Sequence, residues 1–201
     1  MSPLILAFDT SAAHCAAAVL CGDTVLQSAT EPMAKGQAER LLGLCQDLLA
    51  QAGAELGDLS AIGVGIGPGN FTGIRISVSA ARGLALGLGI KAVGVSAFDA
   101  LQLGASGPCA CTVDGRRDQV FFKSYGQTEA SAPGLHDLTA LPPFSGPLIG
   151  HAGQAPAYPV AEAIARITAA RFTTETARPA PLYLRPADAA PARDKAPAIL
   201  T

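Results

Sequence analysis

The chain has no tryptophan, and aromatic residues make up only 5% of its 201 positions. Charged residues are also scarce at 15%, while hydrophobic residues reach 49%. Disordered chains combine low hydrophobicity with high charge, so this composition predicts a folded globular protein. Few charges leave little surface reserved for water, which favours a buried interface with another protein. The chain is also rich in glycine, with 22. A genomic bias toward small residues is an equally good explanation of this composition.

A basic footprint is also missing. Proteins that bind nucleic acid directly displace counterions from phosphates with clustered Lys and Arg, whereas this sequence has a formal net charge of −2. We therefore expect any contact with nucleic acid to be indirect. The first residues lack the basic start and long apolar run of a signal peptide. The most apolar helical stretch, residues 74–90, is interrupted by Arg75 and Arg82, so no membrane segment is expected. We predict a cytoplasmic protein.

Neither the cysteines nor the histidines form a recognisable site. The five cysteines are odd in number and scattered, unlike a secreted disulfide framework. Cys109 and Cys111 have one residue between them, where zinc pairs have two or more. No two of the three histidines are four residues apart, and no serine lies in a G-x-S-x-G elbow. We expect buried reduced thiols, no metal and no catalytic residue.

Hydrophobic periodicity predicts alternating strands and helices. Expected strands cover residues 4–8, 15–20, 24–28, 61–66, 91–95, 109–113, 119–125 and 148–150, and expected helices cover 37–52, 71–88, 97–103 and 160–172. The first strand leads into a polar turn and a hairpin, whereas a Rossmann domain would continue into a glycine loop and a helix. Residues 126–147 are expected to be mostly loop, and residues 182–184 to dock on the body.

One short unit occurs twice. An apolar strand ends in Asp9 and the chain returns after a turn, and the strand that ends in Asp114 does the same. This repeat indicates two related halves that face each other across a cleft. We predict an α/β fold with mixed sheets, an N-terminal lobe over residues 1–104, a reduced C-terminal lobe over residues 105–186 and a loose tail over residues 187–201.

Two helices carry more small or apolar surface than one core face needs. The helix expected over residues 37–52 has Leu42 outside its apolar stripe. The helix over residues 71–88 contains Gly73, Gly83 and Gly87. Because each glycine inside a helix costs about 1 kcal/mol relative to alanine, this helix must gain stability elsewhere, most simply by close packing on both sides.

Two loops have the residue types of a phosphate site. The hydroxyls and amides of Asp9-Thr10-Ser11 could face a phosphate while the carboxylate holds hydrated magnesium; alternatively, Asp9 caps a turn. Gly67 and Gly69 precede a helix N-terminus, where anions are favoured; alternatively, they let the helix approach the sheet.

Candidates for a nucleotide or cleft site are thus Asp9, Thr10, Ser11, Gly67, Gly69 and Asp114. His14 could reach the first turn, but we expect it to be a histidine of a surface loop.

Four segments, in the same order, resemble the bacterial TsaB (YeaZ) family, a paralogue of the Kae1/TsaD family. They are I-L-A-F-D-T-S at residues 5–11, G-I-G-P-G-N-F-T-G-I-R-I at 65–76, V-D-G-R-R-D-Q-V-F at 113–121 and L-Y-L-R at 182–185. From the first to the last they span residues 5–185, most of the length of the chain, and residues 67–75 are the most specific. The chain departs from the family pattern at Asn70, where Ser is common, and at Gln119 and Phe121, where Glu and Tyr are usual.

The resemblance implies a two-lobed fold of the actin/Hsp70/sugar-kinase (ASKHA) superfamily and a role in forming N6-threonylcarbamoyladenosine beside the anticodon of tRNA. In that family TsaD binds the catalytic metal through a His-x-x-x-His motif and transfers the threonylcarbamoyl group. TsaB pairs with TsaD, and the ATPase TsaE joins them. This chain has no such histidine motif, which agrees with a non-catalytic subunit that contacts tRNA only indirectly.

The resemblance also places the partner interface on the helical segments over residues 37–52 and 71–87. Carried over to this chain, the interface residues are Arg40, Leu41, Leu44, Leu48, Phe71, Thr72, Arg75, Ile76, Ala80 and Gly83. Without its partner, the chain is expected to form a homodimer through the same helices. No cofactor is required by the chain itself; ATP or ADP with Mg at the heterodimer interface is the ligand that the resemblance leaves open.

Two other functions are weighed against this one. A stand-alone ATP-dependent phosphotransferase of the same superfamily would need a carboxylate aimed at an acceptor hydroxyl, and Asp9 and Asp114 have suitable turn contexts. A peptidase would need a metal pair or a nucleophile with its base, and the sequence contains neither in recognisable form.

Overall fold

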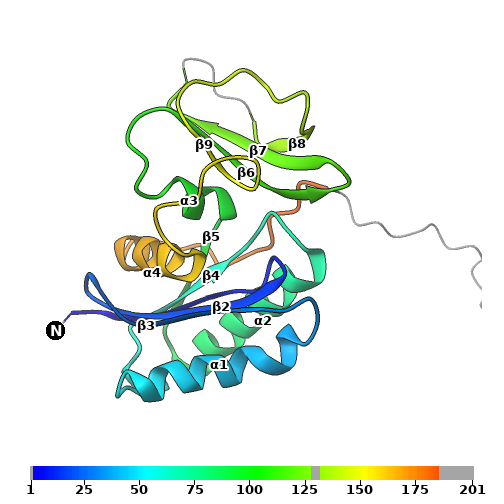
Figure 1. Ribbon diagram of the computed structural model, residues 1–201. Helices are drawn as coiled ribbons and strands as arrows, with labels where there is room; N and C mark the ends of the chain where they lie inside the picture. Colours follow the sequence, from blue (N-terminus) through cyan, green and yellow to red (C-terminus); the bar gives the residue numbers. More distant parts are fainter. Residues whose placement is uncertain (1, 128–131, 186–201) are drawn as a thin grey trace, which may run out of the picture.

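The computed structural model of the protein describes residues 2–127 and 132–185, so the tail expected over residues 187–201 lies outside the described residues. Its strands form two sheets (Figure 1). The five-stranded sheet has the order β3-β2-β1-β4-β5 and consists of β1 (Leu4–Asp9), β2 (His14–Cys21), β3 (Thr24–Pro32), β4 (Ala61–Gly65) and β5 (Lys91–Val95). The four-stranded sheet has the order β8-β7-β6-β9 and consists of β6 (Cys109–Arg116), β7 (Gln119–Tyr125), β8 (Gly134–Asp137) and β9 (Leu148–Gly150).

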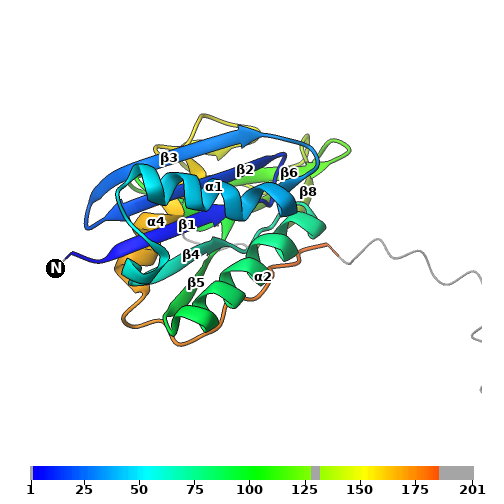
Figure 2. The same cartoon turned by 90° about the horizontal axis from the view of Figure 1, so that it is seen from below.

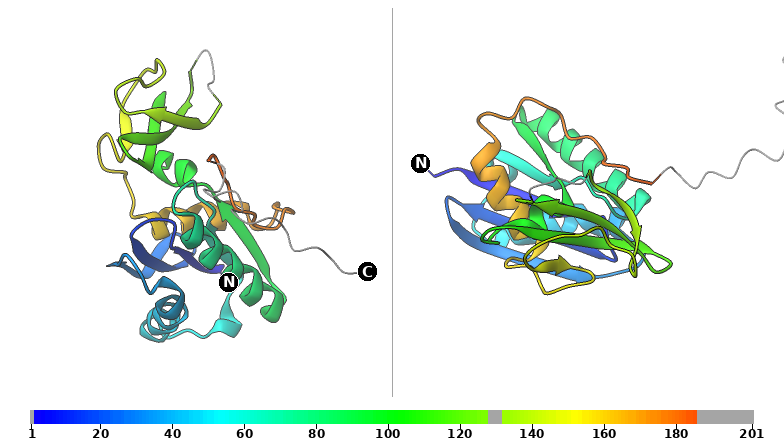
Figure 3. Two further views of the ribbon diagram at one scale, coloured as in Figure 1. Left: turned by 90° about the vertical axis from the view of Figure 1, so that its right-hand side faces the viewer. Right: turned by 90° about the horizontal axis from the view of Figure 1, so that it is seen from above.

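The helices are α1 (Gln37–Gln51), α2 (Phe71–Leu88), α3 (Ala97–Gln102) and α4 (Val160–Arg171), with one 3-10 turn over Leu56–Asp58. Seen from below, α1 and α2 lie side by side across one face of the five-stranded sheet (Figure 2). Helices α3 and α4 lie between that sheet and the four-stranded sheet (Figures 1 and 3). None of the helices in the described part of the chain is both long and apolar enough to span a membrane.

The two sheets share one connectivity. In the first, β1, β2 and β3 pair antiparallel in succession and β4 pairs parallel to β1. In the second, β6, β7 and β8 pair antiparallel in succession and β9 pairs parallel to β6. The second sheet is smaller, because β8 and β9 have only 4 and 3 residues. Two related lobes with mixed sheets, the second reduced, are therefore confirmed.

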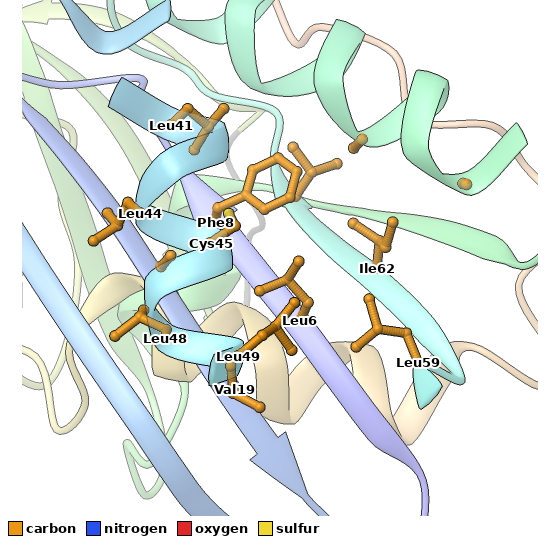
Figure 4. Close-up of a cluster of buried hydrophobic side chains, with 14 of the residues drawn as sticks. Leu6, Phe8, Val19, Leu41, Leu44, Cys45, Leu48, Leu49, Leu59 and Ile62 are labelled. Carbon is orange, nitrogen blue, oxygen red and sulfur yellow. The ribbon is translucent and has the colours of Figure 1, made fainter. Parts of the chain in front are cut away.

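The central strand β1 is buried on both faces, which explains its uninterrupted apolar run. Alternate side chains point to opposite faces of a strand, so Leu6 and Phe8 join the cluster under α1 and α2, while Ile5 and Ala7 join the cluster under α4. Figure 4 shows the first cluster, in which residues of α1 lie with those of the strands. Two helical layers thus cover the two faces of one sheet.

Helix α4 packs on the first sheet, against β1, β2 and β4, although its residues follow the second sheet in the sequence. The approach is close at Gly63 of β4. A Cβ atom there would overlap Thr168 Oγ1 and lie 2.9 Å from Ile164 Cγ2. Since α4 falls in the range predicted for the C-terminal lobe, residues 105–186 do not all pack on one sheet.

Helix α3 connects the two lobes. Its Phe98 belongs to the core of the second lobe, which includes Cys109, Cys111 and Phe121, whereas its Ala100 belongs to the cluster under α4. A short strand, β8, also lies where we predicted mostly loop. Its pairing with β7, rather than its own sequence, makes this segment a strand.

Candidate functional site

A cleft of about 980 Å³ lies where the turns of the two sheets meet. Its walls include the turn after β1, the glycine loop before α2, the β6–β7 turn and residues 182–185. Four of the six candidates from the sequence line it, namely Asp9, Ser11, Gly69 and Asp114. Thr10 and Gly67 are buried and are not among the described residues that line it. The fold therefore brings the two aspartate turns to one cavity, as the repeat predicted.

Asp9 is 2% exposed, and the Oδ1 atom of its carboxylate has three polar neighbours. The Ser11 backbone N–H and hydroxyl donate to it at 2.9 and 2.8 Å, and His14 Nε2 lies 3.0 Å away. The other oxygen, Oδ2, lies against Gly65, where a Cβ atom would overlap it. This geometry is that of an aspartate capping its own turn.

His14 does not lie in a surface loop, contrary to our expectation. It is the first residue of β2, and its ring points back to Asp9 across the turn. The sequence offered one signal, the five-residue separation of the two side chains across a tight turn. That separation alone does not distinguish a contact from a solvent-exposed ring.

The Asp-Thr-Ser turn and the glycine loop are interlocked. The hydroxyl of Thr10 donates to the carbonyl oxygen of Gly73 at 2.7 Å, and the backbone N–H of Asn70 donates to the carbonyl oxygen of Ser11 at 2.6 Å. A Cβ atom on Gly73 would overlap the Thr10 carbonyl oxygen, and one on Gly69 would overlap that of Ser11. These glycines permit the close approach of α2 to the turn.

The amino end of α2 is capped from within the chain. Asn70 is the N-cap residue, and its Oδ1 accepts a hydrogen bond from the backbone N–H of Gly73 at 3.0 Å. Asparagine is a favoured residue at this position. One of the amides that a phosphate could use is therefore engaged by Asn70, which strengthens the tight-turn interpretation of the loop over the anion-site interpretation.

Asp114 is exposed, unlike Asp9, and accepts a hydrogen bond from the backbone N–H of Arg116 at 2.8 Å. The turn that follows has left-handed backbone angles at three residues, with φ of 62° at Arg116, 53° at Arg117 and 58° at Asp118. Asp114 thus also caps a turn, and the residue lines the cleft from the second lobe.

Helix α2 presents the part of the expected interface that is accessible. Phe71, Thr72, Arg75 and Gly83 are exposed, and Ile76 and Ala80 are half-buried. Apart from the adjacent residues and the backbone of the helix itself, a Cβ atom on Gly83 or on Gly87 would meet no described atom within 4 Å. Leu86, between them, is 83% exposed. Nothing in the described fold explains two glycines and a bare leucine on this face.

The interface predicted on the apolar stripe of helix α1 is wrong. Leu41, Leu44 and Leu48 are 1%, 2% and 4% exposed, because they pack on the sheet with Phe8 (Figure 4). They form the core of this chain and are not available to a partner in this fold. A glutamate at Leu48 would therefore disrupt the core and would not test pairing.

Arg40, also expected at the interface, is tied within the chain. Its Nε and Nη2 atoms each donate to Glu31 at 2.8 Å, and its Nη1 atom donates to Asp47 at 2.9 Å. The hydrogen bond from Arg40 lowers the pKa of the Glu31 carboxyl below its ordinary value. On this helix the exposed large apolar residue is Leu42, which lay outside the predicted stripe.

The buried cysteines do not have the environment of a nucleophile. Burial raises the pKa of the Cys15 thiol to about 11 and those of Cys45 and Cys111 to about 12. Thiols with raised pKa values are poor nucleophiles near neutral pH. Within residues 2–127 and 132–185, no three His, Cys, Asp or Glu side chains are grouped so that they could hold a metal ion.

Comparison with known proteins shows which family this chain resembles. A family model described as TsaD, tRNA N6-adenosine threonylcarbamoyltransferase, matches residues 29–140. The tRNA threonylcarbamoyladenosine biosynthesis protein TsaB of Escherichia coli K12 is 35% identical over 130 residues, 62% of this chain and 56% of that relative. An uncharacterized protein of Mycobacterium tuberculosis is 30% identical over 201 residues, covering 93% of this chain and 94% of the relative.

The solved structure of YeaZ from Pseudomonas aeruginosa superposes with a TM-score of 0.71 at 27% identity, over 90% of this chain and 100% of that one. The repeated mixed sheets and the cleft between them define an α/β protein of the ASKHA type. Within that class, the chain belongs to the TsaB (YeaZ) family, which is related to TsaD. The chain spans about half the length of the first curated TsaB relatives that it matches.

Proposed function

We propose that this chain is a non-catalytic subunit that pairs with TsaD, and with the ATPase TsaE, for threonylcarbamoyl transfer to the adenosine beside the anticodon of tRNA. The names of its TsaB relatives, which are biosynthesis proteins for threonylcarbamoyladenosine in tRNA, support the pathway. The match to the TsaD family model supports a common ancestry with the catalytic subunit.

The observation that carries the pairing role is the exposed face of α2. Gly83 and Gly87 are one helical turn apart, and each costs the helix about 1 kcal/mol relative to alanine. Apart from the adjacent residues and the backbone of the helix itself, no described atom lies within 4 Å of where their Cβ atoms would be. A partner helix packed on this face would use the missing side chains for close approach, and would bury Leu86.

A catalytic role is less well supported by the cleft. A phosphotransferase needs a carboxylate that can reach an acceptor hydroxyl, whereas Asp9 is 2% exposed and its carboxylate holds its own turn. Asp114 is exposed, but it too accepts a hydrogen bond from its turn. In both turns the aspartate therefore has a structural role, which favours a non-catalytic function over a phosphotransferase.

The pairing role is tested by Gly83→Arg. Arginine favours a helix more than glycine does, and the site is open, so this variant should melt at or above the wild-type temperature. Titration with TsaD of the same organism should show at least about a hundredfold loss of affinity, because a long charged side chain would block the helix contact. Ala170→Arg, at an exposed position of α4 on the opposite face of the sheet, is the matched control and should bind like wild type.

Wild-type affinity in the Gly83→Arg variant would contradict the proposed surface.

The same titration also tests what we expect of the cofactor, the homodimer and tRNA. We propose that the chain alone needs no cofactor and forms a homodimer that TsaD displaces, which light scattering of the separate and mixed proteins measures. ADP or ATP with magnesium, added to the titration, tests for a ligand at the boundary with TsaD. Stoichiometric binding of tRNA to the isolated chain would contradict an indirect role.

A further inference from the structure

Residues 182–185, named here the 182–185 strap, contact both lobes within four consecutive positions. All four line the cleft. In Figure 1 the segment that contains them leaves the first lobe and ends beside the second sheet, and Figure 3 shows it at the level between the sheets. The sequence predicted that residues 182–184 dock on the body, but it did not show that they join two bodies.

The first half of the strap is held by the first lobe. The backbone N–H of Leu182 donates to the carbonyl oxygen of Ile66, just after β4, at 2.8 Å. The ring of Tyr183 stacks on that of Phe71 at the start of α2, with the centroids 4.8 Å apart and the planes inclined by 29°. The guanidinium of Arg75 lies 4.8 Å from the centroid of the Phe71 ring.

The second half is held by the second lobe. Leu184 packs against the cluster that includes Cys111 and Phe121. The Nη2 atom of Arg185 donates to Oε1 of Gln119, the first residue of β7, at 2.6 Å. Because residues 183 and 184 are joined by one peptide bond, a shift of the second lobe must move Tyr183 or break one of these contacts.

Phe71, Tyr183 and Arg75 also reach the surface. Phe71 is 38% exposed and Tyr183 is 43% exposed, and Arg75 lies one turn further along α2 on the exposed side. They form the amino end of the α2 face on which Gly83 lies. An exposed aromatic pair flanked by an arginine has the composition of an interface anchor.

We propose that the 182–185 strap couples the position of the second lobe to binding at α2, with Tyr183 itself contacting the catalytic partner. This inference rests on the proposed function for the identity of the partner, TsaD. The partner fits a surface that includes Tyr183 only when Leu184 and Arg185 hold the second lobe in place. Binding and lobe position then influence each other, because linkage between two sites is reciprocal.

The test uses two variants on the second-lobe side, Leu184→Ala and Arg185→Ala, which leave Phe71, Tyr183 and the rest of α2 intact. Amide hydrogen exchange of β7 and of residues 182–185 should be faster in both variants, and affinity for TsaD should fall by about three- to tenfold. Tyr183→Ala should lose a similar factor, because it removes a side chain that contacts the partner. Ala170→Arg, the control on α4 at the opposite face of the sheet, should change neither measurement.

The outcomes separate this inference from the proposed function. Faster exchange in Leu184→Ala and Arg185→Ala with wild-type affinity for TsaD would show a strap without coupling, and would overturn the inference. Unchanged exchange would show that the strap does not hold the lobe, and would also overturn it. Failure of the wild-type protein to bind TsaD would instead overturn the proposed function, and exchange in the isolated chain would still report whether the strap holds the second lobe.

Discussion

The hydroxyl of Thr10 donates a 2.7 Å hydrogen bond to the carbonyl oxygen of Gly73, and the carbonyl oxygen of Thr10 itself lies where a Cβ atom of residue 73 would be. The turn after β1 and the first turn of α2 therefore fit together only with glycine at this position. The contact joins residues that are 63 positions apart in the sequence. It fixes the start of the helix that carries the proposed partner surface.

Gly73→Ala should consequently destabilise the protein, although alanine favours helices. The added methyl group would overlap backbone rather than a flexible side chain, so the turn and the helix must separate. We expect a loss of about 2–4 kcal/mol in the free energy of unfolding, measured by urea denaturation. Gly83→Ala is the matched control, because it adds the same methyl group to the same helix in open space, and it should gain up to about 1 kcal/mol. Equal stability of the two variants would contradict the interlocked turn.

At Thr168, in contrast, a substitution should increase the free energy of unfolding. Its side chain is fully buried under the first sheet, and its Oγ1 atom has no hydrogen-bond partner in the described part of the chain. A buried hydroxyl without a partner costs about 1–3 kcal/mol. Thr168→Val keeps the shape and removes the hydroxyl, so the free energy of unfolding should rise by about 1 kcal/mol. Thr168→Ser, which keeps the hydroxyl and loses the methyl group, should be less stable than wild type. A less stable valine variant would indicate that the hydroxyl has a partner such as water.

Asp99 of α3 joins elements of both lobes and should make stability depend on acid. Burial alone would raise the pKa of its carboxyl, but the hydrogen bond from Tyr125 and the charges of Lys123 and Arg171 outweigh burial, so the pKa is lowered. A carboxyl whose pKa is lower in the folded state stabilises the fold above its ordinary pKa of about 4, and this stability is lost as the pH falls through the folded value.

Asp99→Asn should therefore be less stable than wild type near about pH 6, and the difference should shrink toward about pH 3 as the wild-type carboxyl is protonated. Urea denaturation of both proteins across this range measures it. Asp23→Asn, at an exposed position in the turn between β2 and β3 and outside the network, serves as the control for general charge effects. A difference that is constant with pH would contradict the role of the ionised carboxylate.

Local patterns in the sequence predicted the helices well. The expected helix over residues 71–88 has the observed bounds of α2, and that over residues 37–52 exceeds α1 by one residue. Apolar spacing is a property of the segment's own sequence, so it predicts a helix without any knowledge of the rest of the fold. The repeat of the two aspartate turns likewise predicted two lobes, because hairpin signals are local.

The predictions that failed depend on distant neighbours. Periodicity shows that one face of α1 is apolar, but not whether a sheet or another protein covers it, and this is why Leu41, Leu44 and Leu48 were assigned to the partner interface. In the same way, the contact of His14 with Asp9 depends on how a turn closes. The packing of α4 on the first sheet depends on the whole path of the chain.

Cys21 should be the one thiol that reacts readily in the folded protein. Cys15, Cys45, Cys109 and Cys111 are buried, and burial raises the pKa of each thiol, whereas Cys21 is partly exposed at the end of β2. A thiol must be both accessible and ionised to react with a disulfide reagent. Titration with Ellman's reagent near about pH 8 should therefore modify one thiol quickly in the native protein and all five after unfolding in urea. Cys21→Ser should abolish the fast phase and leave the unfolded protein with four reactive thiols. A fast phase that persists in this variant would mean that one of the buried cysteines becomes exposed in the native state by local opening, and the cysteine variants that then lose it would identify the segment that opens.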